Sequence, residues 1–124
     1  MNPQQYVEPD RVRKQVYTDP EIFDLEMERI WERIWVYCGH QSQVPEPGDY
    51  HALTIGRQPM IMVRRADGGI QVLYNRCPHR GVQLVGNLKG NTGNAFVCSY
   101  TPGAFTSTAA CAPYRWPRAT KARA

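Results

Sequence analysis

The chain has 124 residues, of which 42% are hydrophobic, and this supports one domain with a modest core. The formal net charge is +4 and the isoelectric point is near 9.0. All eleven acidic residues lie at or before Asp67, whereas residues 101–124 carry four basic side chains and no acid. The first hundred residues are therefore neutral and hold no basic stripe, which argues against a nucleic-acid or membrane partner.

The N-terminal residues 1–16 are polar and contain Pro3 and Pro9. A segment of this kind predicts an extended arm with little regular structure, which a partner surface would have to order. After the arm, Thr18 and Glu21 have the spacing of a capping box, and Pro20 suits a first helical turn. We therefore expect a helix from about Pro20 to Ile34.

Apolar residues recur at helical spacing along this predicted helix, which indicates that one face is buried. They are Ile22, Phe23, Met27, Ile30, Trp31 and Ile34. Trp31 and Trp35 are interpreted as core residues, and Cys38 as a small buried apolar side chain.

From Tyr50 onward the apolar period shortens to that of strands, predicted at residues 50–55, 58–64, 70–74 and 95–98. Asp67-Gly68-Gly69 is a hairpin signal between two of them. Glycines and asparagines between residues 86 and 94 indicate loops. Residues 101–124 show neither helical nor strand periodicity and are predicted to form an irregular basic tail. The predicted fold is mainly β with one N-terminal helix.

Two cysteine-containing segments carry the chemistry. Cys77-Pro78-His79-Arg80-Gly81 places a thiolate and an imidazole on one tight turn, because Pro78 fixes φ and Gly81 permits a conformation that a side chain would block. A second cysteine lies in Cys98-Ser99-Tyr100. In a [2Fe-2S] centre of the Rieske type, two cysteines hold one iron and two histidines hold the other. Cys77, His79 and Cys98 are the predicted cofactor and metal ligands.

The landmarks from Tyr17 to Tyr100 extend beyond these ligands. They are the helix above, Gly39-His40, Pro45-Glu46-Pro47-Gly48-Asp49-Tyr50, Ile55-Gly56-Arg57-Gln58-Pro59, Tyr74-Asn75-Arg76 before the first cysteine loop, and Phe96-Val97 before the second. In this order they resemble the N-terminal Rieske domain of an aromatic-ring-hydroxylating dioxygenase large subunit. The resemblance implies a small antiparallel β domain with two cluster-binding loops, here assigned to residues 17–100 between the arm 1–16 and the tail 101–124.

One ligand expected from the resemblance is missing. In that family the second loop reads Cys-x-Tyr-His-Gly-Trp, so the second imidazole would stand at position 101, where this chain has Thr101. A threonine hydroxyl is a hard, neutral oxygen donor and a poor replacement for imidazole on iron. Neither His40 nor His51 lies on a turn with a cysteine, so the sequence predicts a Rieske site whose fourth ligand is absent.

The degeneracy of the genetic code after Tyr100 suggests why the fourth ligand is missing. Suppose that the reading frame is shifted, so that each new codon takes the third base of one residue's codon and the first two bases of the next codon. Residues 100–109 then permit His-x-Trp-x-Phe-x-x-Asp-Gly, which is close to the family sequence, although Thr101 and Pro102 do not permit the expected Gly. We hypothesise that the chain is frameshifted and truncated after Tyr100.

For function, the resemblance implies an oxidoreductase of aromatic hydrocarbon catabolism. Its Rieske cluster accepts electrons from a reductase or ferredoxin and passes them to a mononuclear non-heme iron in a second domain, which is not expected in these 124 residues. Intact relatives form homotrimers or assemblies with a small subunit. No catalytic residue is assigned here, and no signal peptide is recognised, so a cytoplasmic location is expected. A non-catalytic remnant and a zinc-binding interaction module remain the alternatives.

Overall fold

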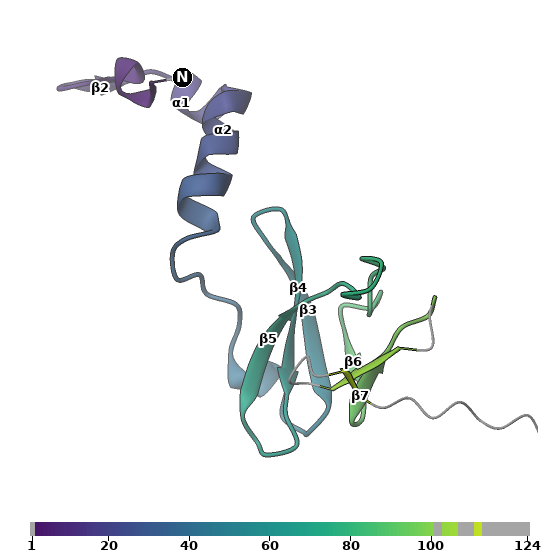
Figure 1. Ribbon diagram of the computed structural model, residues 1–124. Helices are drawn as coiled ribbons and strands as arrows, with labels where there is room; N and C mark the ends of the chain where they lie inside the picture. The colour runs from purple at the N-terminus through teal and green to yellow at the C-terminus, as the bar shows by residue number, and fades with distance from the viewer. Residues whose placement is uncertain (1, 101–102, 107–110, 113–124) are drawn as a thin grey trace, which may run out of the picture. The chain divides into compact units, whose positions relative to one another are not determined.

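The computed structural model describes residues 2–100, 103–106 and 111–112. It divides into two compact units, each considered separately (Figure 1). The first comprises Met1–Tyr37 with Ile55–Arg57, and the second comprises Cys38–Thr54 with Gln58–Ala124. No helix among the described residues is long and apolar enough to cross a membrane.

The start of the first unit is more regular than the sequence predicts. A 3₁₀ turn η1 (Pro3–Tyr6) leads into strands β1 (Val7–Glu8) and β2 (Arg11–Val12), which pair antiparallel. The Glu8 carboxylate accepts hydrogen bonds from Arg11 Nε at 2.6 Å and Arg13 Nη2 at 2.9 Å, and these guanidinium groups lower the pKa of Glu8. The expectation of an arm with little regular structure is wrong here, because the chain folds back into a hairpin that two ion pairs of Glu8 hold.

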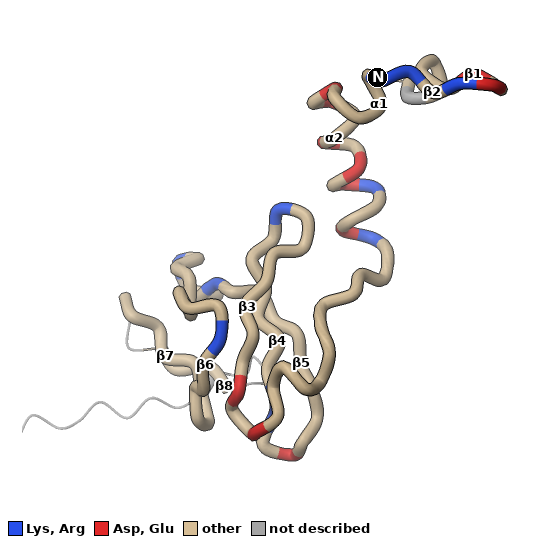
Figure 2. Tube along the Cα trace, turned by 180° about the vertical axis from the view of Figure 1, so that it is seen from behind, with Lys and Arg blue, Asp and Glu red and all other residues tan. Residues whose placement is uncertain are grey.

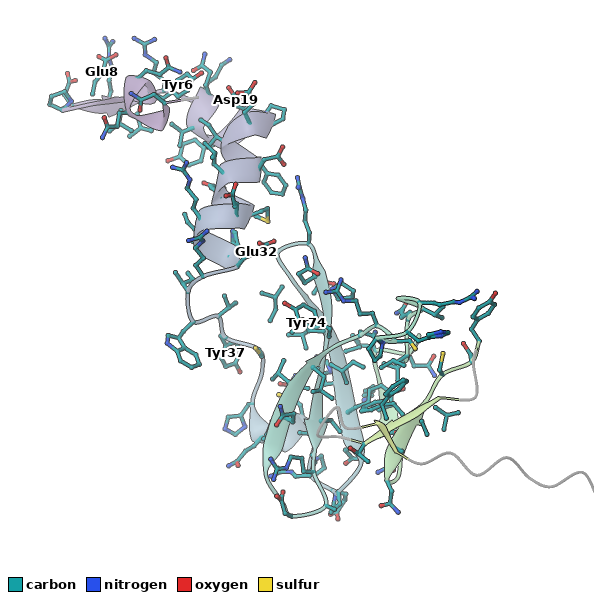
Figure 3. All side chains as sticks on the ribbon, in the orientation of Figure 1. Tyr6, Glu8, Asp19, Glu32, Tyr37 and Tyr74 are labelled. Atoms are coloured by element: carbon teal, nitrogen blue, oxygen red, sulfur yellow. The ribbon has the colours of Figure 1, made fainter. Side chains whose placement is uncertain are left out.

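Helices α1 (Gln15–Thr18) and α2 (Pro20–Glu26) follow, and a π-helical turn η2 (Met27–Trp31) continues α2. The helix begins at Pro20 as predicted but ends before Ile34. The predicted capping box is also wrong, because Asp19 is the N-cap and its carboxylate accepts from the Glu21 N–H at 2.9 Å. Asp19 also accepts from the Tyr6 hydroxyl at 3.4 Å, which ties the helix to η1 (Figure 3).

The predicted buried face of this helix is only partly confirmed. Ile22 and Met27 are buried, but Trp31 is 42% exposed and Trp35 is fully exposed. Cys38 is half-buried. The turn of residues 55–57 belongs to the same unit, and Arg57 pairs there with Asp24. The interpretation of both tryptophans as core residues is therefore wrong for this chain.

The second unit contains a four-stranded sheet of order β5-β4-β3-β6. A 3₁₀ turn η3 (Gln41–Gln43) precedes its strands β3 (Asp49–Ile55), β4 (Gln58–Arg64), β5 (Ile70–Tyr74) and β6 (Lys89–Asn91). The predicted hairpin joins β4 to β5, and Asp67 accepts from the Gly69 N–H at 2.9 Å there. The predictions for β3, β4 and β5 are confirmed, while β6 was expected to be loop.

A second sheet of order β7-β8-β9 completes this unit. Its strands are β7 (Ala95–Val97), β8 (Ala104–Thr106) and β9 (Cys111–Ala112), and β7 pairs antiparallel with β8. β8 and β9 lie in the segment predicted to be an irregular tail, so that prediction is wrong for these residues; residues 101–102, 107–110 and 113–124 lie outside the described part. Buried Tyr50, Ile61, Val63 and Phe96 form the main core cluster of this unit.

Candidate cluster-binding site

The first cysteine loop is closed by its own backbone. The Cys77 N–H donates to the Val82 carbonyl at 2.7 Å, and the Gly81 N–H donates back to the Cys77 carbonyl at 2.7 Å. Gly81 has φ +72°, a left-handed conformation that favours glycine. Residues 78–80 therefore form the tip of the loop, with His79 exposed on it.

A buried asparagine fixes the chain on both sides of this loop. Asn75, 3% exposed, donates from Nδ2 to the Val85 carbonyl at 2.9 Å. Its Oδ1 accepts from the N–H groups of Leu84 at 3.1 Å and Val85 at 3.0 Å. One side chain thus satisfies three backbone groups next to the loop. Sequence reasoning missed Asn75, because its role depends on a contact ten residues along the chain.

The second cysteine loop has a matching closure. The Cys98 N–H donates to the Gly103 carbonyl at 2.9 Å, five residues on, which is the spacing from Cys77 to Val82. On the far side the chain returns as β8, which places Ala104 opposite Val97 and Phe105 opposite Phe96. Both cysteines therefore stand at the base of a closed loop.

The two loops meet at their bases and at their tips. Cys77 and Cys98 are 1% and 5% exposed and share one apolar cluster with buried Phe105, against which Val82 and Leu84 pack. At the tips, the Arg80 guanidinium carbon lies 5.8 Å from the centroid of the Tyr100 ring, within the range of a cation–π contact. The structure therefore brings together the predicted thiols and places the His79 loop against the Tyr100 loop.

The remaining histidines of the chain are engaged elsewhere or lie on the sheet. His40 caps η3, where its Nδ1 accepts from the Ser42 N–H at 3.2 Å, and His51 lies on β3 opposite Lys89. In the described part of the chain, no three His, Cys, Asp or Glu side chains are arranged to hold a single metal ion. Thr101, the position of the expected fourth ligand, lies outside the described residues.

An apolar cavity of about 360 Å³ lies beside the loops. Its walls include Pro78 of the first loop, Leu84, Phe96 and Phe105. Arg76 also lines it, and its guanidinium carbon lies 4.6 Å from the centroid of the Tyr74 ring on β5. Apolar side chains thus border the base of the site.

Acidic and basic side chains lie together at one end of the second unit. Acidic residues gather at the end of the sheet where β4 and β5 are joined (Figure 2), and there Arg65 pairs with Asp67 and Arg64 donates to the Gly68 carbonyl. Arg76 precedes the first loop and Arg80 lies on its tip, and no acidic residue follows Asp67 in the sequence. The tip of the first loop therefore presents a guanidinium group and an imidazole to solvent.

Comparison with known proteins gives a consistent result. The profile of the Rieske [2Fe-2S] domain matches residues 34–122. The chain is 41% identical to the anthranilate 1,2-dioxygenase large subunit of Acinetobacter baylyi over 90 residues, which are 73% of this chain and 19% of the relative. It is 44% identical to the biphenyl dioxygenase subunit alpha of Paraburkholderia xenovorans over 85 residues, 68% of this chain and 18% of the relative.

Solved structures agree. Naphthalene 1,2-dioxygenase with indole in its active site superposes with a TM-score of 0.75 at 35% identity, over 83% of this chain and 23% of that one. A quaternary ammonium Rieske monooxygenase in complex with gamma-butyrobetaine gives a TM-score of 0.76 at 29% identity, over 82% of this chain and 29% of that one. The chain spans about a fifth of the curated relatives it matches. Together with the two closed cysteine loops, these matches show that the chain belongs to the Rieske [2Fe-2S] domain family.

Proposed function

We propose that this chain is the electron-carrying domain of a ring-hydroxylating dioxygenase large subunit, and that Cys77, His79 and Cys98 bind its [2Fe-2S] cluster. The observation that carries the proposal is the pair of matched loops. Each cysteine N–H is bonded to a carbonyl five residues later, both thiols are buried in one cluster, and Arg80 of one tip contacts Tyr100 of the other.

The donor set fits three of the four positions of such a cluster. Two buried thiols suit the iron that takes sulfur ligands, and the imidazole on the exposed tip suits the iron that takes nitrogen. When bound, a cluster of this class carries one electron at a time. The fourth position has Thr101 in the sequence, and no histidine follows His79.

The protein residues would set access to the cluster. The cysteines lie against Phe105 and Leu84, which would keep water from the sulfur side. His79 and Arg80 are exposed, so a donor protein could approach the imidazole side closely. A reductase or ferredoxin with an acidic surface would complement the arginines of the first loop.

Ring hydroxylation itself is proposed for a longer protein. The relatives are named as dioxygenases, and a mononuclear iron in such enzymes takes two histidines and a carboxylate. After Cys98 this chain has neither histidine nor acid. The proposed catalytic iron, the aromatic substrate site and the assembly into homotrimers, or with a small subunit, would therefore depend on residues outside this sequence.

A non-catalytic remnant is the second candidate, and Thr101 is the observation that favours it. The structure adds a complication, because β8 pairs with β7 beyond Tyr100 and the family match continues to residue 122. The bases after the Tyr100 codon test the frameshift: if they encode no His and Trp in the neighbouring frame, Thr101 is a true substitution.

Anaerobic reconstitution with iron and sulfide tests the proposal. We expect iron and sulfide to bind in equal amounts, with a reduced EPR signal whose average g value lies below that of the free electron. Cys38→Ser is the matched control and should leave the iron and sulfide content and the EPR signal unchanged, because Cys38 lies outside the loops. A folded protein that takes up no metal supports the remnant, and one that takes up zinc alone supports the interaction module.

A further inference from the structure

We propose that the apolar cavity beside the first cysteine loop binds a small aromatic monocarboxylate. The ring of this ligand lies among the apolar walls, and its carboxylate pairs with Arg76. The cavity is lined by none of Cys77, His79 and Cys98, so the site is separate from the proposed cluster ligands. It goes beyond the proposed electron transfer, and its test needs no iron.

The cavity has the size and the lining of a site for a small organic ligand. Its volume of about 360 Å³ lies within the usual range for such sites, about 300–1,000 Å³. Its walls come from β4, β5, the first loop and the second sheet, and they are mainly apolar. Three of them are aromatic, namely Tyr74, Phe96 and Phe105. A flat ring can make edge or offset contacts with such side chains, which add to the gain from burial alone.

The walls are fixed before any ligand arrives. Phe96 and Phe105 stand opposite each other in the β7–β8 pair and are 2% and 8% exposed. The backbone of Leu84, another wall residue, is held by the side chain of Asn75. Tyr74 is 51% exposed, so the cavity opens to solvent on the β5 side. A preformed site of this kind loses little conformational freedom when a ligand binds.

Arg76 gives the cavity its charge preference. Among the described residues that line the cavity, it alone is charged. Its guanidinium carbon lies 4.6 Å from the centroid of the Tyr74 ring, and it forms no hydrogen bond or ion pair with a described residue. A contact with a ring face leaves the N–H donors at the edge of the planar guanidinium group available. These donors are therefore free to meet an anionic group at the mouth of the cavity.

The walls and the guanidinium group together select the ligand class. Arginine binds a carboxylate through two parallel hydrogen bonds. A neutral aromatic molecule would fill the walls but give Arg76 no partner, whereas an inorganic anion would pair with Arg76 but leave the walls uncovered. A second carboxylate on the ring would be buried among apolar groups at a cost. Because Arg76 is exposed, solvent screens the ion pair, and we expect the charge to improve binding about threefold to fivefold.

Benzoate is the probe, and saturation-transfer NMR measures its binding to the full chain at about pH 7, where a carboxylate is ionised. We expect half-saturation on the order of 1 mM. Benzamide keeps the ring without the charge and should bind about threefold to fivefold more weakly. Hexanoate keeps the charge without the ring and should also bind more weakly. Equal or tighter binding of either compound, or displacement of benzoate by equimolar inorganic phosphate, would overturn the inference.

A pair of charge variants tests Arg76. Arg76→Gln should weaken benzoate binding about threefold to fivefold and leave benzamide binding unchanged. Arg80→Gln is the matched control, because it removes the same charge from the loop tip, where Arg80 faces Tyr100 and does not line the cavity. It should leave the binding of both compounds unchanged. Equal weakening of benzoate by the two variants would mean that only the general charge of the loop matters, and would overturn the inference.

Methyl-labelled methionines locate the bound ligand. Met60 lines the cavity, whereas Met27 is buried in the first unit. Benzoate should shift the Met60 methyl signal and leave that of Met27 in place. Val72→Phe fills the cavity with a side chain that strands favour, and it should weaken both benzoate and benzamide, with circular dichroism as the check of folding. A Met60 signal that moves when the protein is diluted but not when benzoate is added would place a second copy of the chain at the cavity, and would overturn the inference.

Discussion

The two cysteine loops have the same backbone closure and different contents. In the first, Cys77 stands at the base and His79 on the tip of a loop that Gly81 and Asn75 hold in place. In the second, Cys98 has the same five-residue closure through Gly103, but no histidine follows it. The comparison teaches that β pairing and apolar burial suffice to build the loop pair, whereas the ligand set depends on single positions at the tips.

The sharpest way to break the comparison is to remove one thiol from each loop. We expect Cys77→Ser and Cys98→Ser to abolish cluster binding equally, because a single remaining thiolate cannot hold the sulfur-ligated iron. Iron and sulfide content after anaerobic reconstitution is the measurement, with Cys38→Ser as the control. A variant of either loop that keeps the full cluster would show that its cysteine is not a ligand.

The next largest effect is expected in the apolar cluster that the two loops share. Phe105 is buried beside both cysteines, so Phe105→Ala should cost about 3–5 kcal/mol in the free energy of unfolding. Chemical denaturation measures this cost. Leu88→Ala, at an exposed position, should change stability by less than about 0.5 kcal/mol. Similar values for the two variants would mean that β8 does not support the site.

Asn75 sharpens the comparison, because its side chain anchors the first loop through three hydrogen bonds. Asn75→Ala should cost about 1–3 kcal/mol, since it leaves the N–H groups of Leu84 and Val85 without their acceptor. Chemical denaturation measures the cost in stability, and the rate of cluster loss in air measures the effect on the loop. Asn87→Ala, exposed in the same connection, is the control; an equal cost there would remove Asn75 from its positioning role.

The contact between the tips should be weak. Arg80→Ala removes the guanidinium from the Tyr100 ring and should cost about 0.5–1 kcal/mol, the usual value for an exposed cation–π pair. Tyr100→Phe keeps the ring and should be neutral by comparison. A double-mutant cycle with Tyr100→Ala measures the coupling, and zero coupling would leave the loops joined only at their bases.

The smallest effect is expected at the opposite end of the sheet. A hydrogen bond from Asn91 Nδ2 at 2.8 Å, with another from the Glu46 N–H, holds the pKa of Asp49 below its ordinary value. A lowered carboxyl pKa contributes stability above the unfolded pKa, and this is lost as the pH falls through the folded pKa. Between about pH 6 and about pH 3, the midpoint temperature of thermal unfolding should therefore fall less steeply in Asp49→Asn than in the wild-type chain.

Much of the second unit could be predicted from local patterns. The short apolar runs in residues 58–64 and 70–74 and the Asp67-Gly68-Gly69 turn between them give the bounds of β4 and β5, because register and turn are encoded within a few residues. The cysteine segments likewise predict two loops. Their meeting could be expected only from the resemblance, since it depends on contacts across the sheets.

The failures have a common physical cause, which is that long-range contacts override local signals. The sequence predicts Gly90 in a turn, yet it lies in β6 opposite Tyr50, whose side chain covers it so closely that a Cβ would lie 2.9 Å from the Tyr50 hydroxyl. β8 is only three residues long and has too short a pattern to detect. Trp31 and Trp35 follow helical spacing, but spacing alone does not supply the surface that would bury them.

Disulfide trapping in the metal-free chain tests the central claim, that Cys77 and Cys98 converge on one site, most directly. In a Cys38→Ser, Cys111→Ser background, mild oxidation should link Cys77 to Cys98 within the chain, and mass spectrometry of the digest should identify that peptide pair. Links formed only between chains, or two thiols that stay fully reduced in the folded protein, would contradict the account.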